Sequence, residues 1–297
     1  MSSRPNLSSV RGNKLGIGIF KLLLRCGGFR PALLLAKIVT WFYAQYDRAA
    51  FASTVNYLKL RFPEDQSDPR KLKRHFHALL YELAKMLILS RSMGEGKSLP
   101  LEEVNPEFIP DSGGVVLVLA HYGCWQASME LLNRKDGRPV SIMARPDHNM
   151  NMDKFQAVRK KHRGFDFKII STEGFAGGLI EASAALERGE ALIVMGDRAV
   201  DGTAGIEADY FGGKIELPLS PWMLAARNNV PAIPVFTEFR EKPDRIEIRY
   251  CAPIRFSPQS RRIRQEELRA GIMQYAKDLE EAARQSPYQV FRFGNEK

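Results

Sequence analysis

The sequence contains few of the features that mark metal-binding, disulfide-rich or secreted proteins. Its 297 residues include three cysteines, with no Cys-x-x-Cys pair and no histidine at ligand spacing from other candidate ligands, so we expect neither a metal site nor a disulfide framework. A reducing compartment fits this cysteine content. No basic, apolar and small-residue leader opens the chain, so we also expect no cleaved secretory signal.

Long uncharged apolar runs are missing as well. Two apolar stretches lie near the start, at residues 15–24 and 31–46, and each is interrupted by a basic residue. Neither reaches the roughly 20 uncharged residues that a membrane-spanning helix needs. No internal repeat or low-complexity segment is visible, and 44% hydrophobic residues suffice for a packed core, so we expect a globular protein.

Positive charge is concentrated in the first third of the chain. Residues 1–100 hold 17 Lys and Arg against 6 Asp and Glu, a net charge of +11, whereas the whole chain carries +10. Such a region attracts an anionic surface, and each basic residue close to an anionic membrane contributes about 1 kcal/mol. The sequence carries no nucleic-acid recognition motif, so we expect phospholipid headgroups and no nucleic acid as the partner.

The apolar residues among these charges favour a membrane surface. Lys and Arg can lay their stems along an apolar face with the charge in the headgroups, and Trp41, Phe42 and Tyr43 prefer the same interface. We therefore predict interfacial helices in a basic membrane-associating region over residues 1–100. Ordinary core helices of a soluble domain are the alternative, because periodicity does not distinguish a protein core from a bilayer.

Helical patterning runs to residue 89 with one interruption at 62–68. From residue 115 onward, strand-like and helical segments alternate. The run VVLVLA at residues 115–120 is typical of a strand buried on both faces of a parallel sheet. Further strands are predicted at residues 140–144, 166–171, 190–195, 233–239 and 245–250, and helices at 124–132, 152–163, 176–188 and 261–284. This alternation predicts an α/β domain over residues 101–297, with a mixed, mostly parallel sheet flanked by helices and preceded by the N-terminal helical membrane-docking region.

His121 carries the clearest chemical signal, in the hexapeptide HYGCWQ at residues 121–126. It follows the predicted strand 115–120, and the carboxyl ends of parallel strands open onto the ligand-binding crevice. An imidazole there can take a proton from an attacking hydroxyl or amine, and acyl transfer from a thioester needs little more than such a base and donors for the oxyanion. Spacing alone leaves a histidine that caps the following helix as an equal alternative.

A set of motifs in fixed order resembles the lipid A biosynthesis (lauroyl/myristoyl) acyltransferases, which are related to the glycerolipid acyltransferases. The set covers most of the chain. It comprises the basic apolar N-terminus, His121 with Trp125, and the stretches MGDR (195–198), YFGGKIELP (210–218), VPAIP (230–234) and PYQVFRF (287–293). Each motif is weak alone, whereas the ordered set is fairly specific.

The resemblance implies an acyltransferase that moves a fatty acyl group from acyl-ACP or acyl-CoA to a hydroxyl or amine of a membrane lipid or glycolipid. It implies His121 as general base. It also implies substrate binding by Arg145, Arg159, Asp197 and Arg198, in which the arginines meet anionic groups. No cofactor is expected, because the thioester already activates the acyl group. We expect the protein at the cytoplasmic face of the inner membrane, peripheral or anchored through its N-terminus.

Gln126 departs from the family pattern, which has Asp or Glu at this position. An acid there would orient the imidazole through Nδ1–H and stabilise the imidazolium, whereas an amide supplies no charge. Three outcomes are open: Gln126 acts as a neutral catalytic partner that orients His121, another acid such as Glu130 or Asp197 supplies the charge, or the activity is lost. The last outcome would leave a catalytically degenerate, membrane-associated lipid-binding protein of the same fold.

Two minor expectations concern Cys124 and Asn229. Cys124 lies close to His121 and is a candidate nucleophile, although a free cysteine beside a tryptophan is more often a small buried hydrophobe. Residues 210–222 are expected to form a loop that leads into a short helix. Ser220 and Asn229 stand where the family usually has Gly, and Asn tolerates a positive φ better than most residues.

Overall fold

The computed structural model describes residues 29–94, 99–125, 127, 137–144, 167–173, 175–198, 205–257 and 265–291. These residues form two compact units, and the chain passes from the first to the second between Leu89 and Ser90. The predicted functional boundary between residues 100 and 101 stays a prediction. The predicted helix over residues 152–163, and most of the one over 124–132, lie outside the described residues.

The first unit is helical, as the sequence predicts. Its elements are α2 (Phe29–Tyr46), α3 (Arg48–Ala52), α4 (Val55–Arg61), the 3-10 turn η1 (Pro63–Asp65) and α5 (Pro69–Gly94). The helical run breaks at Asp47 and at residues 53–54, which the sequence pattern did not predict, and the predicted interruption at residues 62–68 is confirmed. Asp68 ends it, because its carboxylate accepts the backbone N–H groups of Arg70 (2.8 Å) and Lys71 (3.2 Å) and so caps α5.

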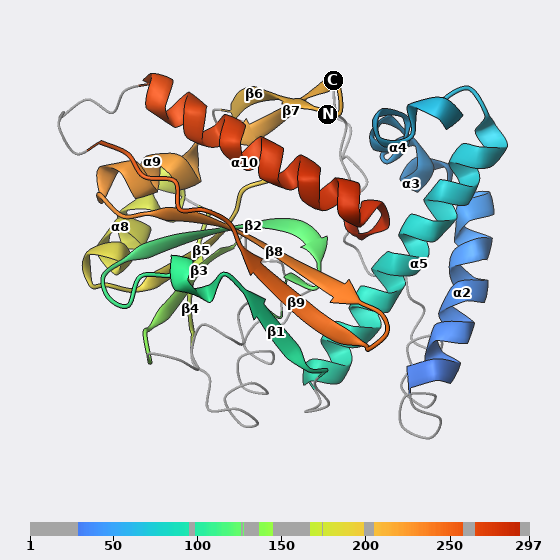
Figure 1. Cartoon of the computed structure of the whole chain (residues 1–297), viewed down its shortest axis with the longest axis horizontal. Helices are drawn as coiled ribbons and strands as arrows, with labels where there is room; N and C mark the ends of the chain where they lie inside the picture. The colour runs from blue at the N-terminus through green and yellow to red at the C-terminus, as the bar shows by residue number, and fades with distance from the viewer. Residues whose placement is uncertain are drawn as a thin grey trace. The chain divides into compact units, whose positions relative to one another are not determined.

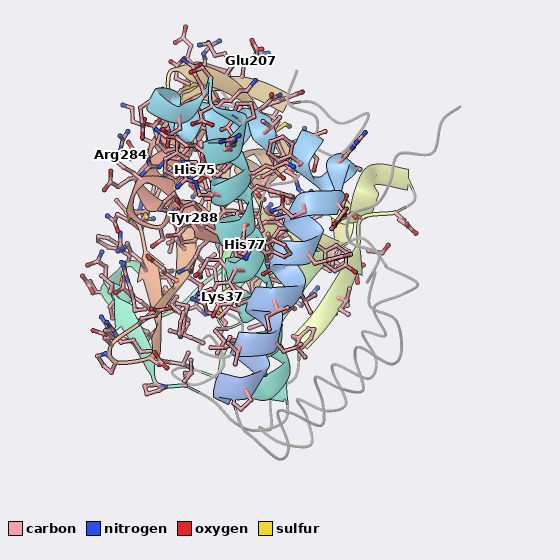
Figure 2. The ribbon with its side chains drawn as sticks, turned by 90° about the vertical axis from the view of Figure 1, so that its right-hand side faces the viewer. Lys37, His75, His77, Glu207, Arg284 and Tyr288 are labelled. Atoms are coloured by element: carbon pink, nitrogen blue, oxygen red, sulfur yellow. The ribbon has the colours of Figure 1, made fainter. Side chains whose placement is uncertain are left out.

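Helices α2 and α5 lie side by side and pack through small residues (Figure 1). Ala32 and Ala36 of α2 are at most 1% exposed and form a buried cluster with Ile88 of α5. His77 of α5 also faces α2, where its Nε2 lies 3.3 Å from the carbonyl oxygen of Lys37 (Figure 2). Alanine lets two helices approach closely, so the large side chains of α2 lie on its other face.

That other face of α2 is apolar and exposed. Leu34, Ile38, Trp41, Phe42 and Tyr46 are between 55% and 69% exposed, and the rings of Phe42 and Tyr46 lie 4.5 Å apart. Successive positions three or four apart share one helix face, so these residues form a continuous surface that we name the α2 stripe. Among the described residues, none of the helices combines the length and the apolar content that a transmembrane span requires.

The second unit is an α/β layer, in which the described residues form a seven-stranded sheet (Figure 1). The strand order is β1-β9-β8-β2-β5-β3-β4, with β8 and β9 antiparallel and the other pairs parallel. The strands are β1 (Leu101–Val104), β2 (Val115–Gly123), β3 (Val140–Ala144), β4 (Phe167–Ser171), β5 (Ala191–Met195), β8 (Ala232–Arg240) and β9 (Arg245–Tyr250). The flanking helices are α8 (Leu179–Glu187), α9 (Ser220–Arg227) and α10 (Gln265–Gln285). The predicted mixed, mostly parallel sheet flanked by helices is confirmed.

Strand β2 lies in the middle of the sheet because its sequence is apolar on both faces. Residues 115–120 are at most 2% exposed, and β2 pairs with β5 on one side and with β8 on the other. Helix α10 crosses the sheet (Figure 1), and the Tyr275 hydroxyl of α10 donates to the Leu119 carbonyl oxygen at 3.1 Å. A residue at the end of β2 is therefore mounted on a buried, rigid strand.

Three strands differ from the expectation. Strand β1 is not expected from the sequence, and residues 210–218, expected as a loop, belong to a hairpin of β6 (Gly205–Tyr210) and β7 (Gly213–Pro218). Phe211 and Gly212 have φ of 49° and 76°, which is the geometry of a type I′ turn. Phenylalanine is uncommon there, so the turn lacks its usual sequence signal. Asn229 has φ of 51°, which confirms the expected positive φ.

Candidate active site

The candidate site lies where β2 separates from β5. Leu119 is the last residue of β2 that pairs with β5, opposite Met195, and the register with β8 shifts between Leu119 and Gly123. Beyond the Leu119–Met195 pair, His121 and Asp197 therefore occupy corresponding positions at the carboxyl ends of two parallel strands. In α/β folds this edge of the sheet is where loops build ligand sites.

Asp197 holds His121 through both its ring and its backbone. The ring Nδ1 lies 2.9 Å from Oδ1 and 3.1 Å from Oδ2 of Asp197. The backbone N–H of His121 donates to Oδ2 at 3.1 Å. An ionised carboxylate only accepts hydrogen bonds, so Nδ1 carries the proton in this pair.

Asp197 is a buried and ionised carboxylate. Its side chain is 1% exposed, against 27% for His121. Burial by itself would raise the pKa of Asp197, but the interactions with His121 and the charge of Arg198 outweigh burial and lower this pKa to about 2. A negative charge is therefore fixed beside the imidazole at physiological pH. It can stabilise the imidazolium that forms when Nε2 takes up a proton.

Arg198 contacts the other ring nitrogen. Its Nη2 lies 3.0 Å from Nε2 of His121, and a guanidinium is only a donor, so Nε2 is the acceptor. The contacts of Asp197 and Arg198 therefore select the same tautomer, with the proton on Nδ1. In that tautomer Nε2 is able to accept a proton. Trp125 lies edge-on to the imidazole, with 6.3 Å between the ring centroids.

A C-terminal segment also contacts the backbone of the site. The Phe291 N–H donates to the His121 carbonyl oxygen at 2.7 Å, and Val290 forms an antiparallel bridge with Tyr122. The motif PYQVFRF is visible in the sequence, but none of its residues indicates a contact with His121. Linear spacing carries no signal for a contact between residues so far apart in the chain.

The structure brings three of the predicted site residues together, namely His121, Asp197 and Arg198. The described residues do not include Gln126, Glu130, Arg145 and Arg159, so their roles stay predictions. Asp197 contacts the ring nitrogen that an acid at position 126 would orient. This contact favours the alternative in which another acid has taken over the charge.

A cysteine nucleophile finds little support in the structure. Cys124 is 1% exposed, and its N–H donates to the Thr237 carbonyl oxygen at 3.0 Å. An enclosed thiol of this kind is poorly placed for a nucleophile, which acts as an accessible thiolate. Among the residues that the structure describes, no group of three or more His, Cys, Asp or Glu side chains could hold a metal ion.

Fold and site together define an α/β protein with a histidine–aspartate pair at strand ends, suited to removing a proton from a hydroxyl or amine. The chain belongs to the bacterial lipid A biosynthesis acyltransferase family, whose sequence model matches residues 15–293. The protein is therefore an acyltransferase of lipid biosynthesis, and it works with an acyl donor and a lipid acceptor.

Among solved structures, the 1-acyl-sn-glycerophosphate (LPA) acyltransferase PlsC from Thermotoga maritima is similar with a TM-score of 0.38 and 16% identity, over 84% of this chain and 96% of that chain. Comparison with the curated proteins gave no significant match. The family assignment therefore rests on the match over residues 15–293.

Proposed function

We propose that the protein transfers a fatty acyl group from acyl-ACP or acyl-CoA to a hydroxyl or amine of a lipid A-like membrane lipid or glycolipid, with His121 as general base. The observation that carries this proposal is the contact between His121 Nδ1 and a buried, ionised Asp197. Asp197 supplies the charge that Gln126 cannot supply. The absence of an acid at position 126 is therefore no reason to prefer a protein that only binds lipid.

The reaction follows from the tautomer of His121. The acceptor gives its proton to Nε2 while its oxygen or nitrogen forms a bond to the thioester carbonyl carbon, and the carbonyl oxygen becomes an oxyanion. Asp197 stabilises the imidazolium through Nδ1–H. When the carbon–sulfur bond breaks, the thiolate leaves and takes the proton from Nε2. The products are the acylated acceptor and the free thiol of ACP or CoA.

Arg198 has to move for this reaction, because it occupies the hydrogen-bonding position of Nε2 that the acceptor needs. Its exposed guanidinium is suited to turn toward the oxyanion or toward an anionic group of a substrate. Arg145 and Arg159 remain predicted partners of anionic groups on the acceptor. The acceptor thus takes the place of Arg198 at Nε2 of His121. The displaced guanidinium is then available to an anionic group of the acceptor.

We further propose that the protein works at the cytoplasmic face of the inner membrane and that the α2 stripe contacts lipid. The stripe presents exposed Trp41, Phe42 and Tyr46, and exposed Lys37 lies about one helical turn before Trp41. Aromatic side chains and the stems of basic ones both favour the boundary between headgroups and acyl chains. The excess of Lys and Arg in residues 1–100 adds attraction to anionic headgroups.

Vesicle co-sedimentation tests this membrane contact, with phosphatidylglycerol-containing vesicles compared with pure phosphatidylcholine vesicles. The double substitution Trp41→Ser with Phe42→Ser is expected to weaken binding at least tenfold, because burying one aromatic side chain contributes roughly 1.5–3 kcal/mol. Ile180→Ser is the control, since Ile180 is 73% exposed and lies outside the stripe. Equal losses in the two proteins, or no loss in either, would contradict the proposed contact.

Acyl transfer itself is tested with labelled acyl-ACP, and separately acyl-CoA, and a total bacterial envelope lipid extract. The wild type is expected to form a labelled lipid that His121→Ala does not form. Mass spectrometry of the product identifies the acceptor and distinguishes an ester from an amide. Lipid binding by the wild type without any turnover would instead support the catalytically degenerate alternative.

A further inference from the structure

We propose that the segment Pro287–Phe291, which we name the hook, positions His121 for proton transfer, and that Gln289 is the residue that fixes the hook. The proposal rests on the proposed role of His121 as general base and adds a positioning residue to the site. The hook follows α10 directly, where the 3-10 turn η4 (Pro287–Gln289) begins with a proline that ends the helix.

The hook holds the backbone at His121. The Phe291 N–H donates to the His121 carbonyl oxygen at 2.7 Å, and Val290 pairs with the neighbouring Tyr122. Phe291 and Val290 are 7% and 4% exposed, so this pairing is shielded from water. Because β2 pairs with β5 only as far as Leu119, the hook supplies backbone pairing where the β5 ladder has ended.

Gln289 attaches the hook to β8. Its side chain is buried, Oε1 accepts from the Phe239 N–H at 3.0 Å, and Nε2 donates to the Phe239 carbonyl oxygen at 2.9 Å. A side-chain amide offers the same donor and acceptor as a peptide group. Gln289 therefore continues the β8 ladder beyond the point where Gly123 pairs with Thr237. A carboxylate of the same length lacks the donor.

The root of the hook is bonded to the same two strands. The Ser286 hydroxyl contacts the Glu238 carboxylate of β8. The Tyr122 hydroxyl at the end of β2 donates to the Ala282 carbonyl oxygen of α10 at 3.0 Å. The end of α10, the hook and the strand end that carries His121 are therefore joined by hydrogen bonds at several points.

This bonding bears on catalysis because proton transfer depends on the position of Nε2. A displacement of about 1 Å can cost on the order of 100-fold in rate, even when its cause lies away from the reacting atoms. Asp197 fixes the N–H side of His121, and the hook fixes its carbonyl side. Loss of the Gln289 side chain removes the hydrogen bonds that attach the hook to β8. The contact of the hook with the His121 carbonyl oxygen is then less firmly held.

The first test compares Gln289→Ala with Gln285→Ala, whose side chain bonds Glu281 on the protein surface. Gln289→Ala is expected to lower kcat per folded enzyme by about 10- to 100-fold, with little change in KM for the acyl donor. Gln285→Ala is expected to keep the wild-type kcat. Equal kcat values for the two variants would overturn the proposal.

The second test uses Gln289→Glu, which separates positioning from general destabilisation. The ionised carboxylate cannot donate to the Phe239 carbonyl oxygen, whereas the protonated carboxyl can. Burial raises the pKa of a carboxyl, so the protonated fraction is expected to grow as the pH is lowered. The ratio of the variant's kcat to that of the wild type is therefore expected to rise as pH falls from 8 to 5.5. Dividing by the wild-type kcat removes any pH dependence that the two proteins share. A ratio that does not change with pH would overturn the proposal.

The third test reads the position of His121 without requiring turnover. Diethyl pyrocarbonate modifies the unprotonated ring nitrogen of histidine, and peptide mass spectrometry gives a separate rate for each residue. Gln289→Ala is expected to raise the rate at His121 several-fold, while His75 and His77, in the other unit, keep their rates as internal references. An unchanged rate at His121 overturns the proposal. If Gln289→Ala raises the modification rate of His121 but the wild type transfers no acyl group, the role of the hook is supported and the proposed function is overturned.

Discussion

Replacing Asp197 with asparagine removes the charge beside His121 while keeping the shape of the side chain. One carboxylate oxygen accepts from the ring Nδ1 and the other from the backbone N–H of His121. An amide has a single acceptor oxygen, so its NH2 group must face one of these two nitrogens. If the NH2 group faces the backbone N–H of His121, two donors oppose each other. If it faces Nδ1, it favours the tautomer with the proton on Nε2, and that nitrogen cannot then act as base.

The expected loss of rate is large because the charge is buried. In a serine-protease triad the corresponding acid-to-amide change costs about 10^4 in kcat. Asp197 is 1% exposed and its pKa is lowered to about 2, so a full negative charge acts on the imidazolium with little screening by water. We therefore expect Asp197→Asn to lower kcat by about 10^3- to 10^4-fold, with a much smaller change in KM.

Single-turnover acyl transfer measures this effect on the chemical step, with circular dichroism to confirm that each protein is folded. Asp209→Asn is the matched control, because Asp209 is 80% exposed and bonds Lys214 on the surface. The control is expected to keep the wild-type rate. A rate for Asp197→Asn within about tenfold of the wild type would refute the assignment of Asp197 as the acid partner of His121.

Three other predictions follow from the geometry of the site. Arg198→Ala is expected to lower kcat about 100-fold, with partial recovery in Arg198→Lys, if Arg198 supports the oxyanion; an unchanged kcat in steady-state assays would exclude that role. Gly123→Ala is expected to lower Tm by at least about 5 °C, because a Cβ would collide with the Thr237 carbonyl oxygen. Gly137 also has a positive φ but has open space around it, so Gly137→Ala is expected to lower Tm by less. The folded-state pKa of Asp197 lies below its ordinary value of 3.8, so its stabilisation is present above that value and is lost as pH falls toward about 2. The difference in urea unfolding free energy between wild type and Asp197→Asn should therefore shrink over that acid range, and a constant difference would contradict the pairing.

Buried strands and their ends were predictable because their signals are local. The apolar run at residues 115–120 and the alternation that follows it indicate a parallel sheet, and His121 and Asp197 each stand just beyond such a run. Parallel strands bring their carboxyl ends to one edge of the sheet. The sequence therefore places Asp197 near His121, although the two residues are 76 positions apart.

The remaining features depend on contacts that no linear pattern encodes. Gln126 departs from the family pattern, which the sequence alone shows, whereas the contact between Asp197 and His121 requires the register that sets Leu119 opposite Met195. The hairpin of β6 and β7 has Gly212 in its turn but an atypical first turn residue, because Phe211 adopts a positive φ that is uncommon for an aromatic residue. The hook contacts His121 only through the folding of α10 back onto the sheet.

The central claim is that His121 works with Asp197 and needs no acid at position 126. Acyl transfer by the wild type, Gln126→Ala, Gln126→Glu and His121→Ala, measured side by side with acyl-ACP and envelope lipids, tests it most directly. We predict that the wild type transfers acyl groups and that the rate of Gln126→Ala lies within about tenfold of the wild-type rate. We predict no transfer by His121→Ala. Turnover by Gln126→Glu alone would contradict the claim and identify the natural protein as a lipid-binding relative of the enzymes.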